Sequence, residues 1–389
     1  MTFLKYTIQL ETLKAQGLYR SHRIIDDKTV LNFCSNDYLG LAKNETVIST
    51  FKNAADSYGV GSGSAHLICG HSLAHHALEE ELAEFTGRER ALLFSTGYMA
   101  NIGTINALVQ RGDFVFEDKL NHASLLDGGL SSGANFKRYP HADLERLEKL
   151  LSIASGQKLI VTDGVFSMDG DVAPLHELAI LAKQNAALLM VDDAHGFGVL
   201  GKTGGGLVEE LNLTQEDVPI LMGTLGKAFG TFGAFIAGSE TLIETLIQSA
   251  RTYIYTTALP PAIAEATRAS LKIVIAETWR REKLQVLISQ FKTGAVQLNL
   301  PLMPSDSPIQ PLLIGDSFRA TELSQQLLEA GFLVSAIRPP TVPKNKARLR
   351  ITLSALHEFE DVTRLLEALD RLLKVTSNNS KQPLFFIFC

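Results

Sequence analysis

The stretch Met190-Val191-Asp192-Asp193-Ala194-His195-Gly196 decides the fold of this chain. An apolar run, Ala186 to Val191, ends abruptly there at two acids, a histidine and a glycine. Such an ending is typical of a buried parallel strand whose C-terminal tip delivers a carboxylate into a cleft. A second apolar run, Pro219 to Met222, ends shortly before Lys227, which lies among glycines.

A carboxylate at the end of one strand and a lysine after the next suit a pyridoxal phosphate (PLP) site. The lysine amine can bind the cofactor aldehyde, and Asp192 can keep the pyridine nitrogen protonated so that the ring accepts electrons. Each residue alone has a commoner explanation, because strands often end in aspartate and a lysine in a glycine-rich loop is usually solvated. The pair, in this order on consecutive strands, suggests PLP.

The composition is that of an ordinary globular protein. With 389 residues, 46% hydrophobic and 20% charged, the chain can form two domains around a large core. The net charge of −6 gives no basic field for nucleic acid, and the three distant cysteines support neither a disulfide framework nor a thiolate metal site. No stretch approaches the roughly 20 apolar residues of a membrane span. We therefore expect a soluble, cytoplasmic protein.

The order of the expected elements predicts an α/β fold. Between residues 91 and 237, short apolar strands alternate with helices, which indicates βαβ units and a mostly parallel sheet covered on both faces. One long helical stretch is expected from Pro261 to about Val296, and an α+β unit after residue 301. The predicted domains are an N-terminal helix and arm (1–45), a large domain (46–285), a small C-terminal domain (286–375) and a tail with an apolar end (376–389).

Three further positions fall at the same predicted edge of the sheet. Ser95-Thr96-Gly97-Tyr98 joins a strand to a helix, and its N–H groups predict a cup for a dianion. His122 opens another helix, where it could stack on a pyridine ring or simply cap and pack the helix. Ser167 lies in the loop that follows strand 159–162.

Other polar residues allow two interpretations. Arg348 and Arg350 lie on a late strand, where an arginine can bind an α-carboxylate through two parallel hydrogen bonds, or can be a surface residue of an edge strand. His71 and His75 are four residues apart at the start of a helix. A metal pair is conceivable, but no H-E-x-x-H pattern and no third ligand nearby support it, so we interpret both as structural histidines.

Two glycine-rich stretches match nucleotide-binding patterns weakly. Gly59 to Ser64 resembles a dinucleotide loop, but no strand is expected before it, and its glycines favour a close approach to a ligand or a neighbouring subunit. Gly196 to Thr203 fits the P-loop pattern G-x-x-x-x-G-K-[ST]. A P-loop needs a helix that begins at the Lys-Thr, whereas three glycines follow, each costing about 1 kcal/mol in a helix. An ATP-hydrolysing function is therefore a remote alternative.

Taken together, ordered segments along nearly the whole chain resemble the α-oxoamine synthases, PLP enzymes of aminotransferase fold type I. These segments are NFCSNDYLGL (32–41), GSGSAHLICGHSLAHHALEEELAEF (61–85), LNHASLLDG (120–128), GVFSMDGD (164–171), VDDAHGFGVLG (191–201), TLGKAFG (224–230), YTTALPP (255–261), AIRPPTVP (336–343) and RLRITLSALH (348–357). The resemblance implies a large PLP-binding domain and a smaller α+β domain.

Carried over position by position, the resemblance implies roles for fourteen residues. Lys227 would hold the cofactor covalently, Asp192 would pair with the pyridine nitrogen, and His195 would lie near the phenolic oxygen. The other cofactor contacts would be His122, which stacks on the ring, with Gly97, Tyr98, Ser167 and Thr224, and with Thr256 and Thr257 from the other subunit of a homodimer. Asn36 and Arg350 would hold the substrate carboxylate, and Arg20 and Thr341 would contact the acyl substrate. No metal is implied.

The resemblance also implies a reaction. Within the family, AIRPPTVP and TLGKAFG are most similar to members that condense L-alanine with a pimeloyl thioester, of CoA or of acyl carrier protein, with loss of CO₂. Another α-oxoamine synthase, such as a 2-amino-3-ketobutyrate CoA ligase, is the alternative, and a catalytically inactive subunit is a third. The thioester carrier and the role of the C-terminal tail stay open.

Overall fold

The computed structural model describes residues 3–22, 24–25 and 29–379. The chain divides into two compact units. Unit 1 comprises Met1–Asn36, Met168–Gly170 and Lys283–Cys389, and unit 2 comprises Asp37–Ser167 and Asp171–Glu282. None of the described helices is long and apolar enough to cross a membrane.

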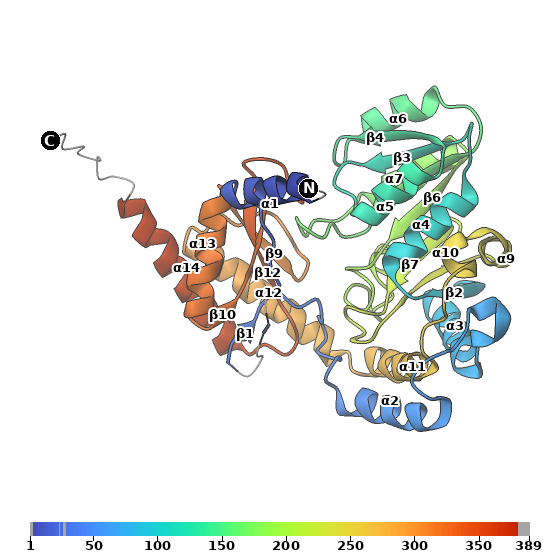
Figure 1. Cartoon of the computed structure of the whole chain (residues 1–389), viewed down its shortest axis with the longest axis horizontal. Coiled ribbons are helices and arrows are strands. Elements are labelled where there is room, and N and C mark those ends of the chain that lie inside the picture. Colours follow the sequence, from blue (N-terminus) through green and yellow to red (C-terminus); the bar gives the residue numbers. More distant parts are fainter. Residues whose placement is uncertain (1–2, 23, 26–28, 380–389) are drawn as a thin grey trace. The chain divides into compact units, whose positions relative to one another are not determined.

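Unit 2 is built on a seven-stranded sheet (Figure 1). Its strands, in spatial order, are β2 (Arg90–Phe94), β8 (Ala234–Gly238), β7 (Ile220–Thr224), β6 (Ala187–Asp192), β5 (Lys158–Asp163), β3 (Phe114–Asp118) and β4 (Asn135–Tyr139). Strand β8 runs antiparallel to both of its neighbours, and all other pairs are parallel. The mostly parallel sheet expected from the βαβ rhythm is confirmed.

Alternating side chains of the central strands enter two apolar cores, one on each face of the sheet. Met190 of β6 packs into one core, while Leu189 and Val191 pack into the other. This explains why the strand is an unbroken apolar run. The first core is closed by α4 (Gly97–Leu108), α5 (Ala123–Ser131), α9 (Glu240–Ser249) and α10 (Arg251–Ile254), and the second by α6 (Leu144–Ser152), α7 (Leu175–Gln184) and α8 (Leu207–Glu210).

The remaining helices of unit 2 precede and follow this sheet along the chain. They are α2 (Glu45–Tyr58), the short π-helix η1 (His66–Gly70), α3 (Leu73–Thr86) and α11 (Pro261–Ala276). Helix α11 packs against both α2 and α3. Gly87 adopts the left-handed conformation that ends α3, as its position in the sequence suggested.

Unit 1 contains the smaller α+β arrangement. Strands β11 (Ser335–Ile337), β12 (Ala347–Thr352) and β9 (Ile309–Gly315) form an antiparallel sheet with β12 in the centre, and β1 (Leu31–Asn32) pairs in parallel with β10 (Phe332–Leu333). Its helices are α1 (Leu4–Ala15), most of α12 (Trp279–Gln297), α13 (Ser317–Glu329) and α14 (Phe359–Asn379).

Several expected elements differ in detail. The helical stretch from Pro261 to Val296 is two helices, because α11 ends at Ala276 with a non-helical Glu277 and α12 begins at Trp279. Residues 332–337 of the α+β unit form two strands, β10 and β11, which pair with different partners. Helix α14 continues past Leu373 to Asn379, and the apolar end 384–389 lies outside the described residues.

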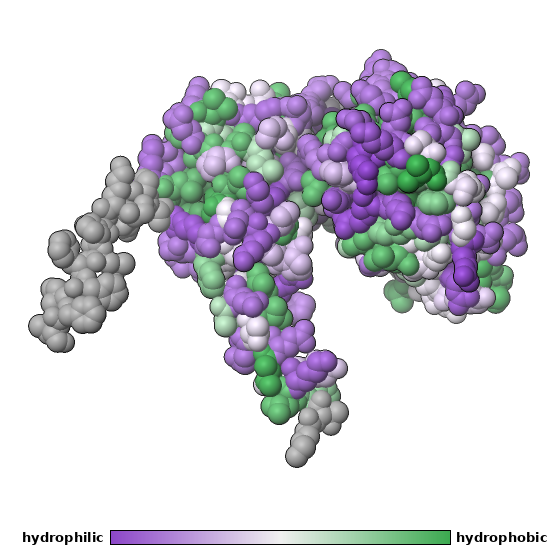
Figure 2. Space-filling view, turned by 90° about the horizontal axis from the view of Figure 1, so that it is seen from above, coloured by the Kyte–Doolittle hydropathy of each residue, from purple (hydrophilic) through white to green (hydrophobic). Residues whose placement is uncertain are grey.

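Helix α1 forms as expected, but none of its residues Leu4–Ala15 is buried. Large apolar side chains, among them Leu4 and Ile8, stay exposed. The apolar and polar side chains of this helix are not separated onto opposite faces, so the helix is not amphipathic. Exposed apolar side chains are interspersed with polar ones on the surface (Figure 2).

Candidate active site

A cavity of about 190 Å³ opens at the carboxyl edge of the parallel strands of unit 2. Because β5, β6 and β7 are parallel, they deliver Asp163, Asp192 and Thr224 to the same edge. The N-terminus of α4 and the residues that start α5 meet them there. The lining residues are Gly97, Tyr98, Asn101, His122, Ser124, Asp163, Ser167, Asp192, Ala194, His195, Met222, Thr224 and Lys227.

The cavity thus brings together every cofactor-contacting residue implied by the sequence except Thr256 and Thr257. Those two follow α10. The backbone of Thr257 forms a β-bridge with Ala65, and its carbonyl accepts a hydrogen bond from Ser95 Oγ.

Lys227 lies in a short chain of polar contacts. Its Nζ is 2.8 Å from His195 Nε2, and His195 Nδ1 is 2.6 Å from the hydroxyl of Tyr38, which is fully buried. An ammonium group can only donate, so a protonated Lys227 fixes His195 with its proton on Nδ1, directed at Tyr38. A proton at Lys227 can therefore be shared with the imidazole of His195.

Both oxygens of Asp192 are held by donors. Oδ1 accepts the N–H of Ala194 at 3.0 Å, and Oδ2 accepts the side-chain amide of Asn101 at 2.6 Å. Asn101 is completely buried in α4 and donates its second amide proton to Ser124 Oγ at 2.8 Å. The carboxylate of Asp192 is thus fixed in orientation by the first turns of α4.

The same contacts fix the tautomer of His122. Ser124 Oγ accepts from Asn101, so its own proton points to His122 Nδ1, 2.7 Å away, and the N–H of Ser124 also donates to that nitrogen. His122 therefore carries its proton on Nε2. Burial lowers the pKa of His122, with Asp192 opposing and Lys227 reinforcing the shift. The ring is uncharged at neutral pH and can lie against an aromatic cofactor.

Two further buried carboxyls surround Asp192. Asp163 pairs with it in register on β5 and accepts the N–H of His122 at 2.9 Å. Burial, reinforced by the charge of Asp192, holds the pKa of Asp163 well above its usual range. Burial also raises the pKa of Asp193 to about 8. Burial therefore favours the protonated form of both neighbours of Asp192.

Asp193 stabilises the loop Gly196–Thr203, which resembles a P-loop, and the glycines that follow it. Its Oδ2 accepts the N–H of Leu207 at 2.6 Å, and a Cβ on Gly206 would lie 2.0 Å from that oxygen. The N–H groups of Gly201 and Thr203 are bound by carboxylates of α8.

These carboxylates occupy the place that a nucleotide phosphate would need. Within the described residues no helix begins at Lys202-Thr203, because α8 starts only at Leu207. The nucleotide-binding interpretation of this loop is therefore wrong, as the glycines after it suggested.

In unit 1 the predicted carboxylate-binding pair is assembled. Arg350 Nη2 donates to Asn36 Oδ1 at 3.1 Å, and its Nη1 donates to Thr352 Oγ1 at 2.8 Å. Arg348, on the same strand, is ion-paired with Asp169. Both arginines are buried and β12 is the central strand of its sheet, so the alternative of surface arginines on an edge strand is wrong.

Arg20 and Thr341 also meet within unit 1. Arg20 Nη2 donates to Thr341 Oγ1 at 3.1 Å. Both line a small cavity of about 210 Å³ together with Leu18 and the stretch 336–339. Such a cavity, with a guanidinium at its wall, can hold a polar or anionic group of a substrate.

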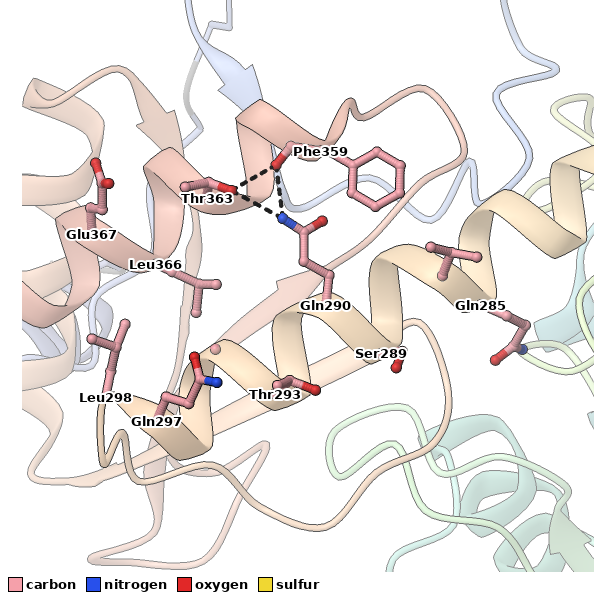
Figure 3. Close-up of a pocket in the computed structure, with 12 residues that line it drawn as sticks. Gln285, Ser289, Gln290, Thr293, Gln297, Leu298, Phe359, Thr363, Leu366 and Glu367 are labelled. Atoms are coloured by element: carbon pink, nitrogen blue, oxygen red, sulfur yellow. Dashed lines mark hydrogen bonds between the residues drawn. The ribbon is translucent and has the colours of Figure 1, made fainter.

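A larger groove of about 750 Å³ lies between α12 and α14 of unit 1 (Figure 3). Gln290 of α12 links the two helices by donating to the carbonyl of Phe359 and to Thr363 of α14 (Figure 3). Among its lining residues Glu367 is the one ionisable side chain. The lining of this groove has no lysine, histidine or cysteine beside that single carboxyl group, whereas the smaller cavity of unit 2 holds a lysine, two histidines and two aspartates, so that cavity is the candidate active site.

Sequence reasoning missed Tyr38, Asn101, Ser124 and Asp163. Asp163 could have been identified from the sequence, because it ends β5 in the same way as Asp192 ends β6. Tyr38 stands in the motif NFCSNDYLGL without any sign of its contact with His195. Asn101 lies inside a helix, where only the folded structure shows that it faces Asp192.

The donor set of the cavity fits PLP. It offers an amine for the aldehyde at Lys227, a carboxylate for the pyridine nitrogen at Asp192, an imidazole ring at His122 and a helix N-terminus at Gly97 for the phosphate. Asn101, which lines the cavity, also has a buried acceptor, Oδ1, without a hydrogen-bond partner among the described residues.

Comparisons with known proteins agree with this cavity. The chain is 60% identical over 382 residues to the 8-amino-7-oxononanoate synthase of Saccharophagus degradans, covering 95% of this chain and 96% of the relative. The structure of 8-amino-7-oxononanoate synthase from Francisella tularensis superposes with a TM-score of 0.79 at 35% identity, covering 90% of this chain and 100% of the other.

A serine palmitoyltransferase from S. paucimobilis, solved with a bound PLP–myriocin aldimine, superposes with a TM-score of 0.90 at 28% identity over 97% and 98% of the two chains. Residues 28–369 match the family described as aminotransferase class I and II. The α/β architecture with a small antiparallel sheet is that of fold-type I PLP enzymes. The chain therefore belongs to the aminotransferase class I and II family.

Proposed function

We propose that this protein is an 8-amino-7-oxononanoate synthase. It condenses L-alanine with a pimeloyl thioester, releasing the thiol and CO₂, as a PLP-dependent acyltransferase of biotin biosynthesis. The 60% identity to the S. degradans enzyme over nearly the whole chain supports the substrate class. The observation that carries the chemistry is the cavity that holds the amine of Lys227 and the carboxylate of Asp192 together.

Lys227 is the proposed covalent anchor and base. PLP bound there supplies an electron sink for the electron pair that remains when a proton or CO₂ leaves the Cα of the amino acid. Lys227 Nζ takes the Cα proton and later returns one, and His195, 2.8 Å away, shares that proton. Asp192, held by Asn101 and Ala194, keeps the ring nitrogen protonated throughout.

The other cavity residues bind and orient. His122 lies against the ring face, and Gly97 and Tyr98 offer the N–H groups of the first turn of α4 to the phosphate. Ser167 and Thr224 complete the cofactor contacts. In unit 1, Asn36 and Arg350 bind the carboxylate of alanine, which fits the planar guanidinium. Arg20 and Thr341 contact the acyl thioester.

We also propose a homodimer in which Thr256 and Thr257 reach the cofactor phosphate of the partner. Exposed apolar side chains support such an interface, because Val60, Ile68 and Leu73 are 86%, 79% and 80% exposed in one short segment. Both thioester carriers, CoA and acyl carrier protein, are intracellular, so we place the reaction in the cytoplasm.

Product analysis tests the proposal. Purified, PLP-loaded protein is given alanine, glycine or serine in turn, each with pimeloyl-CoA, acetyl-CoA or palmitoyl-CoA, and products are identified by mass spectrometry. We expect turnover with alanine and pimeloyl-CoA. The superposition on a serine palmitoyltransferase favours serine with palmitoyl-CoA as the second candidate. Faster turnover of that pair, or of glycine with acetyl-CoA, would contradict the proposal.

A further inference from the structure

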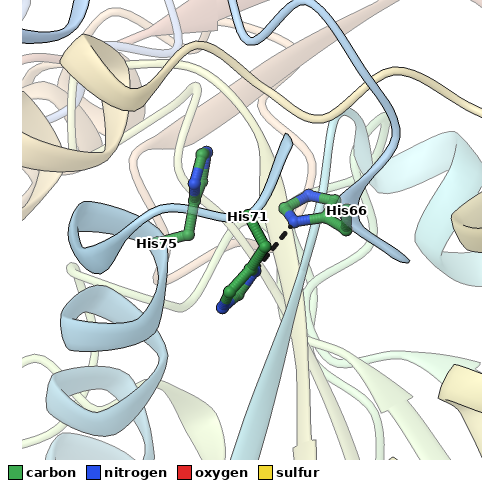
Figure 4. A group of neighbouring side chains, drawn as sticks. All are labelled: His66, His71 and His75. Carbon is green, nitrogen blue, oxygen red and sulfur yellow. Dashed lines mark hydrogen bonds between the residues drawn. The ribbon is translucent and has the colours of Figure 1, made fainter. Parts of the chain in front are cut away.

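Three histidines of unit 2 converge outside the candidate active site (Figure 4). His66 belongs to η1, His71 follows it, and His75 lies in the first turn of α3. One ring nitrogen of each lies within 4.8 Å of the others. The sequence interpretation expected no third ligand beside His71 and His75. That expectation is wrong, because the tight π-turn of η1 returns His66 to them.

We propose that His66, His71 and His75 form a binding site for a divalent transition metal of the zinc class. The nitrogens His66 Nδ1 and His71 Nδ1 are 3.0 Å apart. Two imidazole ligands on one tetrahedral zinc ion, each about 2.0–2.1 Å from the metal, stand about 3.3 Å apart. The pair therefore already has nearly the spacing of two ligands. A set of imidazoles without carboxylates favours Zn²⁺, Co²⁺ or Cu²⁺ over Mg²⁺ or Ca²⁺.

One of the three histidines, His75, has the outer contact that is typical of a metal ligand. A metal-bound histidine almost always donates its second ring N–H to an oxygen. His75 Nε2 donates to the carbonyl of Leu259 at 2.7 Å, and His71 Nε2 is 3.8 Å from Glu79 Oε2. His75 Nδ1 accepts the N–H of Ser72 at 3.0 Å, and this capping bond is what an ion at that nitrogen would replace.

Two of the three rings, those of His66 and His75, are buried. His71, whose side chain is 30% exposed, gives an ion access to the two buried rings.

Occupancy would tie together separate segments of unit 2. Leu259 lies two residues from Thr257, and Ser62 Oγ donates to the carbonyls of Ala258 and Leu259. An ion on the three histidines would join η1 and α3 to the backbone that carries Thr256 and Thr257. Because the ion binds the folded chain, it should raise the Tm.

Metal uptake by the full-length, PLP-loaded protein tests the site. After treatment with EDTA, the wild type is equilibrated with Zn²⁺ and the bound metal is counted, and Co²⁺ is used separately to detect its tetrahedral visible bands. We expect one ion per chain and a higher Tm. His66→Gln and His71→Ala should each weaken binding at least tenfold, because each removes one of the three ligands.

Matched controls isolate the three-histidine set. His76→Ala and Glu80→Gln change an exposed pair on the same helix, and His176→Ala changes an exposed histidine of α7; all three should leave Zn²⁺ uptake unchanged. Lys227→Ala should also bind the ion normally, which separates this site from the proposed catalysis. If His66→Gln does not fold, the half-exposed His71→Ala decides.

Two results would overturn the proposal. One is a wild type that takes up no more Zn²⁺ than His71→Ala. The other is a loss of uptake in His76→Ala equal to that in His71→Ala, which would assign the ion to the exposed group of His71, His76 and Glu79 instead.

Discussion

Lys227 is the residue on which the proposed chemistry depends. Lys227→Ala removes the amine that holds the cofactor and moves the Cα proton, so turnover should fall to a trace. The fold should survive, because the side chain is half-buried and belongs to a loop after β7. Product formation and the Tm of the PLP-loaded variant measure the two effects.

The control is Lys202→Ala, which changes an exposed lysine in the neighbouring glycine loop and should keep full activity. Substantial turnover in Lys227→Ala would refute the assignment.

Asn101 is a positioning residue for Asp192. Asn101→Ala removes the 2.6 Å bond to a charged oxygen, a contribution of about 1.5–3 kcal/mol. We expect kcat to fall about 10- to 100-fold while PLP still binds, and the visible spectrum of the bound cofactor to change its pH dependence. Asn106 lies on the same helix as Asn101 and contacts Ile102 of that helix and Gly128 of α5. Asn106→Ala is the control and should leave both kcat and the pH dependence of the spectrum unchanged. If the pH dependence of the cofactor spectrum is the same in Asn101→Ala as in the wild type, Asn101 contributes only to packing and does not position Asp192.

Residues that end strands were predictable, and residues that reach the cavity from elsewhere were not. Asp192 and Lys227 follow apolar runs, and the parallel register of β5, β6 and β7 brings such ends together. Asn101 and Tyr38 act through contacts with residues 91 and 157 positions away in the sequence. No local pattern encodes such distances.

At the scale of elements, the glycine loop after β6 depends on its lack of side chains. Gly206 has a φ of +91°, and a Cβ there would lie 2.0 Å from Asp193 Oδ2. Gly206→Ala should therefore lower the free energy of unfolding by about 3 kcal/mol or more, since strain and overpacking each cost about 1–3 kcal/mol. Urea denaturation measures the loss. Gly133→Ala is the control, because Gly133 has a φ of +75° but open space around it. Equal losses in both would show that the contact with Asp193 is unimportant.

His141 joins the end of β3 to the loop before α7 and makes stability depend on pH. Its hydrogen bonds to Asp118 and then Asp171 raise its pKa to about 10. The folded pKa lies above the unfolded value near 6.5, so the ion pairs stabilise fully below about pH 6.5, and this stabilisation is lost as the pH rises toward 10. His141→Gln should cost about 2 kcal/mol at pH 6 and progressively less up to pH 10 in urea denaturation.

The exposed substitution His176→Gln is the control for that pH series and should change little at any pH. A cost of His141→Gln that stays constant from pH 6 to pH 10 would show that the imidazole contributes by packing against Phe166 and not by charge.

The order of elements was predictable from periodicity, whereas their breaks were not. Strands such as β6 are apolar on both faces, and Gly87 marks the end of α3. No glycine or proline in the sequence marks the break between α11 and α12. There Glu277 leaves the helical conformation, and its side chain pairs with Arg280 of the next helix.

At the scale of the whole molecule, the mostly parallel sheet and the small antiparallel sheet follow from the sequence, because the rhythm of strands and helices changes after residue 301. The surface of the proposed dimer does not follow in the same way. Its apolar side chains, such as Ile68 in η1 and Leu73 at the start of α3, have no regular spacing in the sequence that marks an interface.

A mixing experiment tests the shared active sites. Lys227→Ala and Thr257→Asp should each be inactive, the second because an acid at this exposed position would repel the cofactor phosphate. The two variants are unfolded, mixed and refolded together. Half of the dimers then contain one chain of each variant, and each of these has one intact site, so roughly a quarter of the wild-type activity should return.

The matched control is Lys227→Ala mixed with Asp192→Asn, which should stay inactive because both residues line the cavity of the same chain. Sedimentation gives the oligomeric state of each sample. A monomeric wild type, or no recovery with Thr257→Asp, would mean that Thr257 does not serve the site of a partner.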